Sequence, residues 1–560
     1  MALVNGGELV VRTLLEAGVG HVYLLYGGHL QPICEGIRRH GIPYVDMRNE
    51  LTAGYAAQGY ARATGTFGVA LVSAAPGFTN VITSITNAFI DRTPVVYISA
   101  SAAMADAETN NFMSGLDPVT MVRSVTKWAH CVTRTNDIPR LLAHAIRVAT
   151  TAPTGPVLLD LPWDVVFGTV EEGQVRIPQT IRPDGDLLPR AEAVERALGL
   201  LASAQRPAIL VGEGATRREL AKELRTFVEA TGVPVFSCYE GYGLLPTRHP
   251  LYAGGLMKLA DFREPSRAPD VVLALGVRFG FMTVGTDGLV PANARLIHVD
   301  VDPREIGRTR DVAVAMPAGA REALEALNAG SRSHAWPDWS AWHDVLRSAR
   351  VARAEGLAQE AAGRTSPIPP YHAAKAIAAS LDDDTCVVVD GADAHMWIAE
   401  TVERGEPGRF FSHASFFGCL GYGLGFSMGV QNAHPDQRVV CVTGDGALGF
   451  TLAEFHTMAR HDLPIVVVVM NNRAWGATSH FQDTTAFGAD KRYFAVDLSG
   501  AAYHDVAAAF GCHSALVKKL EELAPAMRAA FASGKPACIN VEIAVEDVAP
   551  DHRAMVFLRS

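Results

Sequence analysis

The chain has 560 residues, of which 49% are hydrophobic and 19% are charged. This composition is typical of a folded globular protein with length enough for about three to four domains, so an intrinsically disordered chain is excluded. The net charge is −10 and no block of basic residues stands out, which argues against a protein that binds nucleic acid or an anionic membrane surface.

The N-terminal segment, MALVNGGELVVRTLLEAG, lacks the basic region and the small-residue cleavage site of a secretory signal, and its apolar spacing is helical. Because we find no membrane span in the sequence either, we expect a cytoplasmic location. The eight cysteines are scattered, and no two of them stand at CxxC spacing. This pattern predicts neither disulfides nor a zinc site.

Apolar strand-like runs alternate with helical stretches along nearly the whole sequence. This alternation predicts an α/β protein of three tandem doubly wound domains with mainly parallel sheets. The expected domains are separated by polar connectors that contain proline, and they cover residues 1–165, 190–330 and 369–550. The strand candidates are 21–27, 69–73, 95–99 and 157–162 in the first domain, 207–212, 233–238, 271–276 and 295–302 in the second, and 386–390, 439–445, 464–471 and 537–543 in the third.

Two polar residues stand out in the first domain. His29 follows the first strand candidate, in YGGHLQPI, and Glu50 begins an apolar helical stretch. Taken alone, a histidine after a strand is usually a surface or packing residue, and an acidic residue at a helix start interacts favourably with the helix dipole. A functional interpretation of either residue therefore depends on its surroundings.

In the second domain, GEGATR at 212–217 follows a strand candidate and resembles a nucleotide-binding turn. It lacks a full GxGxxG pattern, and a lone glycine-rich turn is a weak signal. A tight turn from strand to helix is the favoured interpretation, and a bound adenine nucleotide is the alternative.

The most specific pattern lies at 442–476, where VTGDGALGF is followed by VVVVMNNRAWG. One strand delivers Asp445 between two glycines at its carboxyl end, and the next strand delivers Asn472 at its own carboxyl end. Glycines let the backbone approach a phosphate, and open α/β sheets bind ligands at this edge. Carboxylate, amide and carbonyl oxygens, completed by diphosphate oxygens and a water, suit the octahedral coordination of Mg²⁺. Helix capping by the two side chains is the alternative.

This GDG-to-NN pattern resembles the cofactor motif of the thiamine-diphosphate (ThDP) dependent enzymes, the superfamily of acetohydroxyacid synthase and pyruvate decarboxylase. The likeness covers nearly the whole chain, and segments such as NGGELVVRTLLEAGV, GPVLLDLPWDVVF and MNNRAWGATSHFQ are most similar to the benzaldehyde lyases. The resemblance implies a pyrimidine-binding domain at 1–165, a middle Rossmann-like domain at 190–330 and a diphosphate-binding domain at 369–550. It also implies that ThDP and Mg²⁺ bind between two chains, in a homodimer at minimum and in a homotetramer by expectation.

The same resemblance assigns roles to individual residues. Asp445, the Asn472 side chain and the Ala474 carbonyl are expected to bind the metal. Glu50 is expected to hydrogen-bond to the aminopyrimidine ring of ThDP, which promotes loss of the C2 proton of the thiazolium ring. The other expected cofactor contacts are Pro76, Gly77, Asn80, Gly391, Ala392, His413, Gly418, Leu420, Gly444, Gly446, Ala447, Trp475, Gly476 and Ala477.

Two of these assignments carry a qualification. The stretch VSAAPGFTN at 72–80 is similar to the Gly-Pro-Gly turn of the family, with Ala75 in place of the first glycine. Leu420, in GCLGYG, takes the position of the bulky apolar residue that bends ThDP into its V shape, a role that is compatible with ordinary core packing.

The expected activity is cleavage of 2-hydroxyketones (acyloins) to aldehydes, and ligation of aldehydes in the reverse direction. His29 matches the active-site histidine of the benzaldehyde lyases, and the near-neutral pKa of a histidine suits transfer of the substrate hydroxyl proton. For the apolar candidates, core packing is an equally good explanation. The remaining candidates for substrate contact are Gly28, Met113, His395, Trp475, Ala477 and Phe481.

The match departs from the benzaldehyde lyases at positions expected to face the substrate. Those enzymes have a glutamine in the place of Met113, a histidine in the place of Tyr26, a tyrosine in the place of His395 and an alanine in the place of Gly28. Replacing an amide donor by a thioether changes which carbonyl group is oriented, so the substrate need not be benzoin.

The main alternative is a 2-oxo-acid decarboxylase or an acetohydroxyacid-synthase-like carboligase, with or without flavin, because these enzymes share the cofactor residues. Simple decarboxylases usually carry an adjacent His-His pair, which is absent here, where the chain reads Asn111-Phe112-Met113. A cation that binds a carboxylate would favour this alternative, and Arg473 is the candidate. A non-catalytic scaffold is disfavoured because Glu50 and Asp445 are both present.

Overall fold

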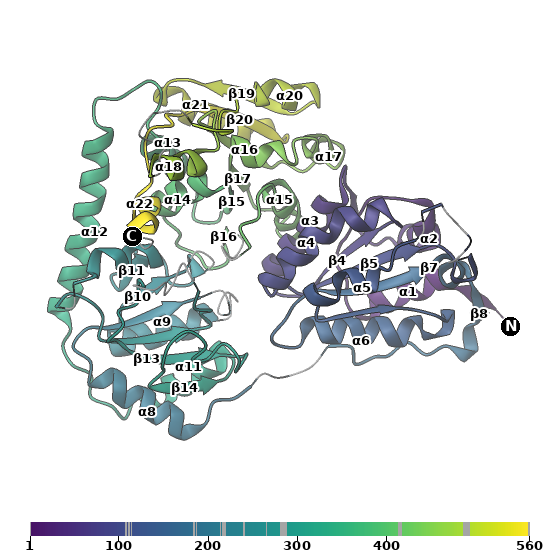
Figure 1. Ribbon diagram of the computed structural model, residues 1–560, viewed down its shortest axis with the longest axis horizontal. Helices are drawn as coiled ribbons and strands as arrows, with labels where there is room; N and C mark the ends of the chain where they lie inside the picture. The colour runs from purple at the N-terminus through teal and green to yellow at the C-terminus, as the bar shows by residue number, and fades with distance from the viewer. Residues whose placement is uncertain are drawn as a thin grey trace. The chain divides into compact units, whose positions relative to one another are not determined.

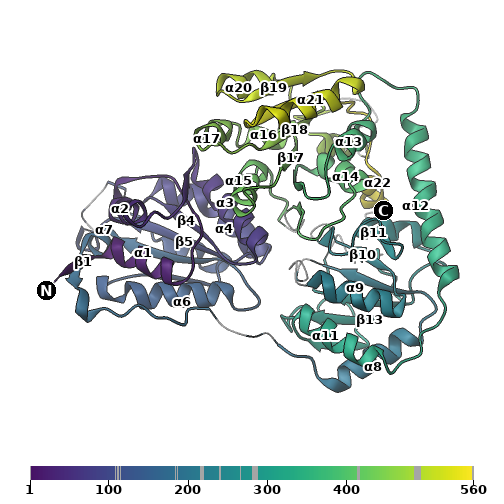
Figure 2. The same ribbon diagram turned by 180° about the vertical axis from the view of Figure 1, so that it is seen from behind.

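The structure is a computed structural model of the chain (Figures 1 and 2). It describes residues 2–106, 109, 112–113, 115–182, 185, 187–212, 214, 220–238, 241–264, 266–280, 288–412, 417–484 and 493–557. The chain divides into two compact units, which are described separately. The first unit comprises Met1–Gly185, Phe416–Gln437 and Thr451–Ile465, and the second comprises Asp186–Ser415, Arg438–Phe450 and Val466–Ser560.

The first unit is built on a six-stranded parallel sheet in the order β3-β2-β4-β5-β7-β6. The central strands are buried and rich in Val, Leu and Ile, as expected for a parallel sheet covered on both faces. Figure 1 shows α3 and α4 on one side of this sheet and α6 on the other. The strands are β2 (Val22–Leu24), β3 (Tyr44–Asp46), β4 (Gly68–Val72), β5 (Val95–Ser101), β6 (Trp128–Cys131) and β7 (Val157–Pro162), and a separate antiparallel pair is formed by β1 (Leu3–Asn5) and β8 (Thr169–Glu171).

The helices of this part of the chain follow the strands in alternation. They are α1 (Gly6–Glu16), α2 (Gln31–His40), α3 (Glu50–Thr64), α4 (Pro76–Ile90), α5 (Pro118–Val122), α6 (Ile138–Thr150) and α7 (Trp163–Phe167), with short 3₁₀ turns η1 (Gly28–Leu30), η2 (Met104–Asp106), η3 (Arg123–Val125), η4 (Thr135–Asp137) and η5 (Glu172–Gln174). Two helices from the C-terminal part of the chain, α15 (Gly423–Ala433) and α17 (Glu454–Arg460), belong to the same unit.

Helix α15 lies directly against α3, and glycines make this approach possible. A Cβ atom on Gly59 of α3 would lie 2.4 Å from the Phe426 carbonyl oxygen, and one on Gly429 of α15 would lie 2.1 Å from the Ala56 carbonyl oxygen. At these two positions the helices therefore touch backbone to backbone.

The second unit contains two further six-stranded parallel sheets. The first has the order β11-β10-β9-β12-β13-β14 and the second has the order β16-β15-β17-β18-β20-β19. Figure 2 shows the long helix α12 running beside both. The strands are β9 (Pro207–Val211), β10 (Val235–Ser237), β11 (Tyr252–Gly255), β12 (Val271–Leu275), β13 (Arg295–Asp300) and β14 (Val314–Pro317), and then β15 (Cys386–Asp390), β16 (Phe410–Phe411), β17 (Val439–Gly444), β18 (Val466–Asn471), β19 (His513–Val517) and β20 (Ala537–Glu542).

Helices surround both sheets. They are α8 (Ala191–Ala202), α9 (Leu220–Thr231), η8 (Leu256–Phe262), α11 (Ala320–Ser331) and α12 (Ser340–Ala361), and then α13 (Pro370–Ala379), α14 (Ala392–Thr401), α16 (Asp445–Gly449), α18 (Gly476–Asp483), α20 (Tyr503–Ala509), α21 (Leu520–Ser533) and α22 (Pro550–Phe557).

The predicted fold class is confirmed, because three α/β domains with parallel sheets follow one another along the chain. Each strand candidate of the sequence corresponds to a strand, with ends displaced by a few residues at most. The strands that the sequence did not reveal are β3, β6, β11, β14, β16 and β19, which are the two edge strands of each sheet, and the short pair β1 and β8. Within the described ranges, none of the helices combines the length and the apolar character needed to cross a membrane. The boundaries of the three domains remain a prediction.

The contact between α3 and α15 can be tested with a pair of glycine substitutions. Gly59→Ala forces the two backbones apart and is expected to lower the free energy of unfolding by about 1–3 kcal/mol. The matched control is Gly199→Ala in α8, where a Cβ atom meets nothing within 4 Å, and it is expected to raise stability by roughly 0.5–1 kcal/mol. Urea denaturation of both variants gives the two values, and equal stability would contradict the proposed close contact.

Candidate active site

The carboxyl ends of three neighbouring strands carry the residues predicted for the diphosphate and the metal. Gly391 follows β15, Asp445 follows β17 and Asn472 follows β18. The strand register pairs β15 with β17 and β17 with β18, so the three strand ends lie along one edge of the sheet. From β15 the chain moves to β16 on one side and then to β17 on the other. This edge is therefore a topological switch point, the place where open α/β sheets bind ligands.

The conformation and the close approach of the backbone favour glycine at this edge of the sheet. Gly391 has a φ of 90°, and a Cβ atom there would lie 3.1 Å from the Gly444 nitrogen. A Cβ atom on Gly446 would lie 2.6 Å from the Trp475 ring, whereas one on Gly444 would meet nothing within 4 Å. The strand ends therefore approach one another closely and leave bare backbone open beside Gly444, which suits the approach of a phosphate group.

Asp445 is the most informative side chain of this edge. It is 2% exposed, and its Oδ2 atom has no hydrogen-bond partner among the described residues. Burial raises the pKa of its carboxyl to about 7, although backbone N–H groups, including those of Arg473 and Ala474, act in the opposite direction. A buried carboxylate oxygen without a partner, next to open backbone, fits a divalent cation that carries a diphosphate.

The other two predicted metal ligands lie beside Asp445 on the next strand end. The Oδ1 atom of Asn472 accepts a hydrogen bond of 3.1 Å from the backbone N–H of Ala474, which turns the amide group back along the loop. A Cβ atom on Gly476 would lie 2.4 Å from the Nδ2 atom of Asn472, so only glycine fits there. The backbone N–H of Ala474 also donates to the Asp445 carboxyl, so the loop that carries Asn472 and Ala474 lies against Asp445.

The sequence analysis missed Asp393, which belongs to the same group. Its Oδ1 atom is buried without a hydrogen-bond partner among the described residues, and its Oδ2 atom lies against Gly476. Burial, and then repulsion from Asp445, raises the pKa of Asp393 to about 7. The Nε2 atom of His480 lies 3.8 Å from Oδ2. The signal in the sequence was an acidic residue two positions after the strand-end glycine Gly391.

Helix α18 continues from the metal donors. Trp475 precedes it, and its ring covers Gly446. Ala477 is half-buried, and the Phe481 ring lies 5.8 Å from the ring of His552. These contacts do not separate a substrate role from packing, so the predicted substrate roles of this helix remain predictions.

The structure places the remaining predicted residues of the C-terminal region in varied surroundings. Ala447 and His395 are buried, and the His395 ring lies 6.3 Å from the ring of Phe410. Ala392 is exposed in the first turn of α14. His413 lies outside the described residues.

Gly418 and Leu420 belong to the first unit, where they precede α15. Gly418 has a φ of 69°, which favours glycine, and Leu420 is half-buried. Between them, the Sγ atom of Cys419 lies 2.5 Å from the hydroxyl of Tyr55 on α3.

The first unit brings together the residues predicted to act on the aminopyrimidine ring. Glu50 is the first residue of α3 and is 8% exposed. Asn80 donates a hydrogen bond of 2.9 Å to its Oε2 atom, and a Cβ atom on Gly77 would lie 3.3 Å from its Oε1 atom. Pro76 begins α4, and Ala75 before it adopts a φ of 51°. A glycine would adopt that φ without strain, which gives a physical reason for the glycine of the family pattern.

His29 lies after β2, on the same sheet edge as the turn that begins α4. Its ring meets the ring of Trp163 edge-on at 5.2 Å, and burial lowers its pKa. Gly28 before it is exposed, and a Cβ atom there would meet nothing within 4 Å. Met113 has a φ of 52°, and Tyr26 is exposed.

Trp163 is a second residue that the sequence analysis did not single out. It begins α7 directly after β7 ends at Pro162, so it lies on the same edge of the sheet as His29. Its ring stacks on Phe167 at 4.0 Å, which fixes its orientation. The signal in the sequence was an aromatic residue directly after a strand candidate.

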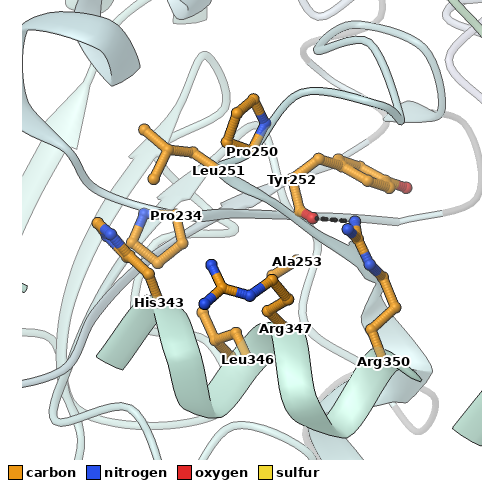
Figure 3. Close-up of a pocket in the computed structure, with 9 residues that line it drawn as sticks. All are labelled: Pro234, Pro250, Leu251, Tyr252, Ala253, His343, Leu346, Arg347 and Arg350. Atoms are coloured by element: carbon orange, nitrogen blue, oxygen red, sulfur yellow. Dashed lines mark hydrogen bonds between the residues drawn. The ribbon is translucent and has the colours of Figure 1, made fainter. Parts of the chain in front are cut away.

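A hollow of the second unit contains none of the predicted site residues (Figure 3). Arg350 donates to the Tyr252 carbonyl at 3.0 Å, the His343 ring donates to the Gly232 carbonyl at 2.8 Å, and Arg347 is paired with Asp344. The cationic side chains of this hollow are engaged by the protein itself. The hollow is lined by Pro234, Pro250, Leu251, Tyr252, Ala253, His343, Leu346, Arg347 and Arg350.

The predicted nucleotide-binding turn at 212–217 lies mostly outside the described residues. Gly212 and Gly214 are described, and both contact Gly276 at the end of the neighbouring strand β12. The N–H of Gly214 donates to the Gly276 carbonyl at 2.9 Å. Nucleotide binding at this turn stays a prediction.

The metal role of Asp445 gives a prediction about stability. Asp445→Asn removes a buried charge, so the cofactor-free variant is expected to gain about 1–3 kcal/mol at pH 8 while losing Mg²⁺-dependent binding of ThDP. Since folding raises this pKa from 3.8 to about 7, the gain grows as the pH rises through that interval and is absent in stronger acid.

Denaturation of the cofactor-free protein at several pH values measures this gain, and titration with ThDP measures binding. The control is Asp505→Asn in α20, an exposed carboxylate whose removal is expected to change neither quantity. A loss of stability in Asp445→Asn at pH 8 would contradict the assignment.

Comparison with known proteins gives matches along the chain. The N-terminal TPP binding domain, the central domain and the C-terminal TPP binding domain of the thiamine pyrophosphate enzymes match residues 4–121, 194–327 and 390–541. A probable acetolactate synthase of Mycobacterium bovis is 32% identical over 96% of this chain and 95% of its own length. The large subunit of acetolactate synthase isozyme 2 of Escherichia coli is 29% identical over 96% of this chain and 95% of its own. The 2-hydroxyacyl-CoA lyase 2 of Bos taurus is 29% identical over 92% of this chain and 86% of its own.

The matched domains carry the same order as the three sheets, and their two cofactor-binding parts contain Glu50, Asp445 and Asn472. The relatives span almost all of the chain, so the likeness is not confined to one domain. The chain belongs to the thiamine-diphosphate-dependent enzymes, in the superfamily of acetolactate synthase and pyruvate decarboxylase, and its cofactors are ThDP and Mg²⁺.

Proposed function

We propose that this enzyme is a carbon–carbon lyase and carboligase that cleaves 2-hydroxyketones to aldehydes and joins aldehydes in the reverse direction. The observation that carries the proposal is the surroundings of His29, whose ring makes a T-shaped contact with the ring of Trp163 and whose pKa is lowered by burial. Such a site suits a neutral hydroxyketone with an apolar substituent and offers one group that can move a proton.

Arg473 bears on the alternative that the substrate is a 2-oxo acid. That alternative needs a cation to hold the substrate carboxylate. Arg473 donates to Oε2 of Glu542 at 2.9 Å, and its side chain lies against Gly500. Since a partner already engages this guanidinium, the contact supports a neutral substrate over an acidic one.

Different residues of the chain bind the metal, bind the diphosphate and orient the aminopyrimidine ring in this proposal. We propose that Asp445, Asn472 and the Ala474 carbonyl hold Mg²⁺ and that the open backbone beside Gly444 holds the diphosphate. The Glu50 carboxylate orients the aminopyrimidine ring, and Asn80 fixes one of its oxygens. Bound ThDP would supply a nucleophilic carbon for the substrate carbonyl and a cationic ring that takes up the electron pair of the broken carbon–carbon bond.

His29 moves the substrate proton in this proposal. Because burial lowers its pKa, the ring is neutral at pH 7 and can accept the hydroxyl proton of the 2-hydroxyketone as the carbon–carbon bond breaks. The ring of Trp163 packs against the His29 ring at 5.2 Å in a T-shaped contact and limits the positions that the His29 ring can take. In the ligation direction the same nitrogen returns the proton to the new hydroxyl group.

The second candidate is a carboligase or decarboxylase acting on 2-oxo acids, and the names of the relatives favour it. Two of those reported above are acetolactate synthases, while the third is a lyase of 2-hydroxyacyl-CoA. Since all of these enzymes share the cofactor residues, the substrate decides between the candidates.

We further propose a homodimer as the smallest active form, a homotetramer in solution and a cytoplasmic location. The domain limits proposed for this assembly are 1–165, 190–330 and 369–550. Light scattering of the purified protein gives the oligomeric state directly.

The substrate class can be decided with one panel of reactions containing ThDP and Mg²⁺. Benzoin, acetoin, pyruvate, benzoylformate and formaldehyde are supplied separately and the products identified. Aldehydes from the hydroxyketones, without carbon dioxide from the oxo acids, are the expected result. Carbon dioxide release without cleavage of hydroxyketones would reverse the assignment in favour of the second candidate.

His29→Ala tests the proton transfer. The variant is expected to lower kcat for hydroxyketone cleavage by about 100-fold or more, with a small change in KM and in ThDP binding. The control is His343→Ala, in the hollow of Figure 3, which is expected to keep the activity of the parent enzyme. A fully active His29→Ala variant would remove this residue from the mechanism.

A further inference from the structure

We propose that Glu454 is a positioning residue for Glu50. Its buried carboxylate holds the backbone that presents Glu50, and thereby sets the direction in which the Glu50 carboxylate points. The inference rests on the role of Glu50 proposed above, and it adds a residue that neither the GDG-to-NN motif nor the predicted site contains.

The contact is direct and lies within the first unit. Glu454 begins α17 and is 1% exposed. Both of its carboxylate oxygens lie 3.2 Å from the backbone nitrogen of Arg48, which donates to them. Asn49 follows Arg48 and caps α3, and Glu50 is the first residue of that helix. The carboxylate therefore holds the chain two residues before Glu50.

A neighbouring hydroxyl fixes the Glu454 side chain. The Oγ1 atom of Thr457, one turn further along α17, donates a hydrogen bond of 2.6 Å to Oε2. Burial raises the pKa of Glu454, and the donors from Thr457 and from the backbone of Arg48 and Asn49 counteract this effect. A buried carboxylate is costly unless such donors meet it, so packing alone does not account for an acidic side chain here.

The C-terminal end of α17 holds the other side of the same loop. Arg460 donates to the Oδ2 atom of Asp46 at 2.8 Å and to its carbonyl oxygen at 2.6 Å. His461 contacts Oδ1 of Asp46 at 2.7 Å. Positions 454, 457 and 461 recur at helical spacing, so one face of the helix meets residues 46–48 at two points.

The position of α17 in the sequence connects this contact with the proposed metal ligands. The helix lies between Asp445 and Asn472, the two side chains proposed to hold the metal. The chain segment that connects the metal ligands therefore also holds the loop that carries the activating carboxylate. A shift of that loop would redirect Glu50 without altering the groups proposed to bind the metal and the diphosphate.

The test is a comparison of Glu454→Leu, Glu454→Gln and the parent enzyme, each at saturating ThDP and Mg²⁺. The rate of hydrogen–deuterium exchange at C2 of bound ThDP reports on Glu50, and Glu454→Leu is expected to slow it by about 10- to 100-fold. Glu454→Gln keeps an oxygen for Arg48 and can donate to Thr457, so it is expected to recover most of the rate. The dissociation constant of ThDP is expected to change by less than about threefold, as the metal ligands are untouched.

A second readout uses the cofactor-free protein. Amide hydrogen exchange of the peptide that covers residues 46–52 is expected to speed up in Glu454→Leu, because Arg48 loses its acceptor. Thr457→Val removes only the hydroxyl that fixes the carboxylate. It is expected to slow the C2 exchange a few-fold, and it replaces the leucine variant if that one does not fold.

The matched control is Gln431→Leu on α15. Gln431 is equally buried in the same unit, but its amide donates to the carbonyls of His434, Pro435 and Gln437 and does not touch the loop. This control is expected to lose stability and keep the C2 exchange rate. The same loss of C2 exchange rate in the control would overturn the proposal, because a general loss of stability would then explain the slower exchange in Glu454→Leu.

Glu50→Gln separates a failure of this inference from a failure of the proposed function. If Glu50→Gln does not slow the C2 exchange, the role of Glu50 itself is wrong. If Glu50→Gln slows the exchange while Glu454→Leu and Thr457→Val leave it unchanged, the role of Glu50 stands and the positioning role of Glu454 is refuted. Equal loss in the Leu and Gln variants of Glu454 would also refute it.

Discussion

A buried carboxylate, which no cationic side chain of the described residues pairs with, governs the edge of the sheet that is proposed to bind the cofactor. Asp445 is buried where the strand ends approach one another closely. Asp393 is a second acidic residue beside it. A cation alone would leave the open space beside Gly444 unfilled, and an anion alone would add to the negative charge. A metal diphosphate meets both needs together. The arrangement therefore explains physically why glycines, an aspartate and an asparagine recur in this motif.

The architecture could be predicted because the interior of each parallel sheet is covered on both faces, so its strands are continuous apolar runs. Runs such as Val466–Asn471 and Val439–Gly444 are visible in the sequence for that reason. Edge strands carry fewer constraints, since one side of each has no strand to pair with. Trp128–Cys131 is half-buried throughout and Phe410–Phe411 is only two residues long, so neither leaves a clear pattern in the sequence.

The residues of the candidate site also differ in how well the sequence predicts them. The local sequence predicted the position of Asp445 at a strand end and of Glu50 at a helix start, whereas the role of Glu50 came from the resemblance to the family. Asp393 and Trp163 were missed because their importance arises from neighbours on other strands, which no local pattern records. Ala75 occupies a backbone conformation that suits glycine, and this strain is visible only in the structure. The substrate-facing residues are the least predictable, since apolar side chains in a core and in a pocket follow the same sequence pattern.

The close contact between α3 and α15 has a mechanical consequence. Backbone lies on backbone at Gly59 and Gly429, so no compressible layer of side chains separates the two helices at this crossing. Sliding or tilting of the whole helix would create overlap at once. Any adjustment of Glu50 to a reacting molecule is therefore confined to the first turn of the helix and to the residues just before it, and the remainder of α3 acts as a fixed frame of reference for the reaction.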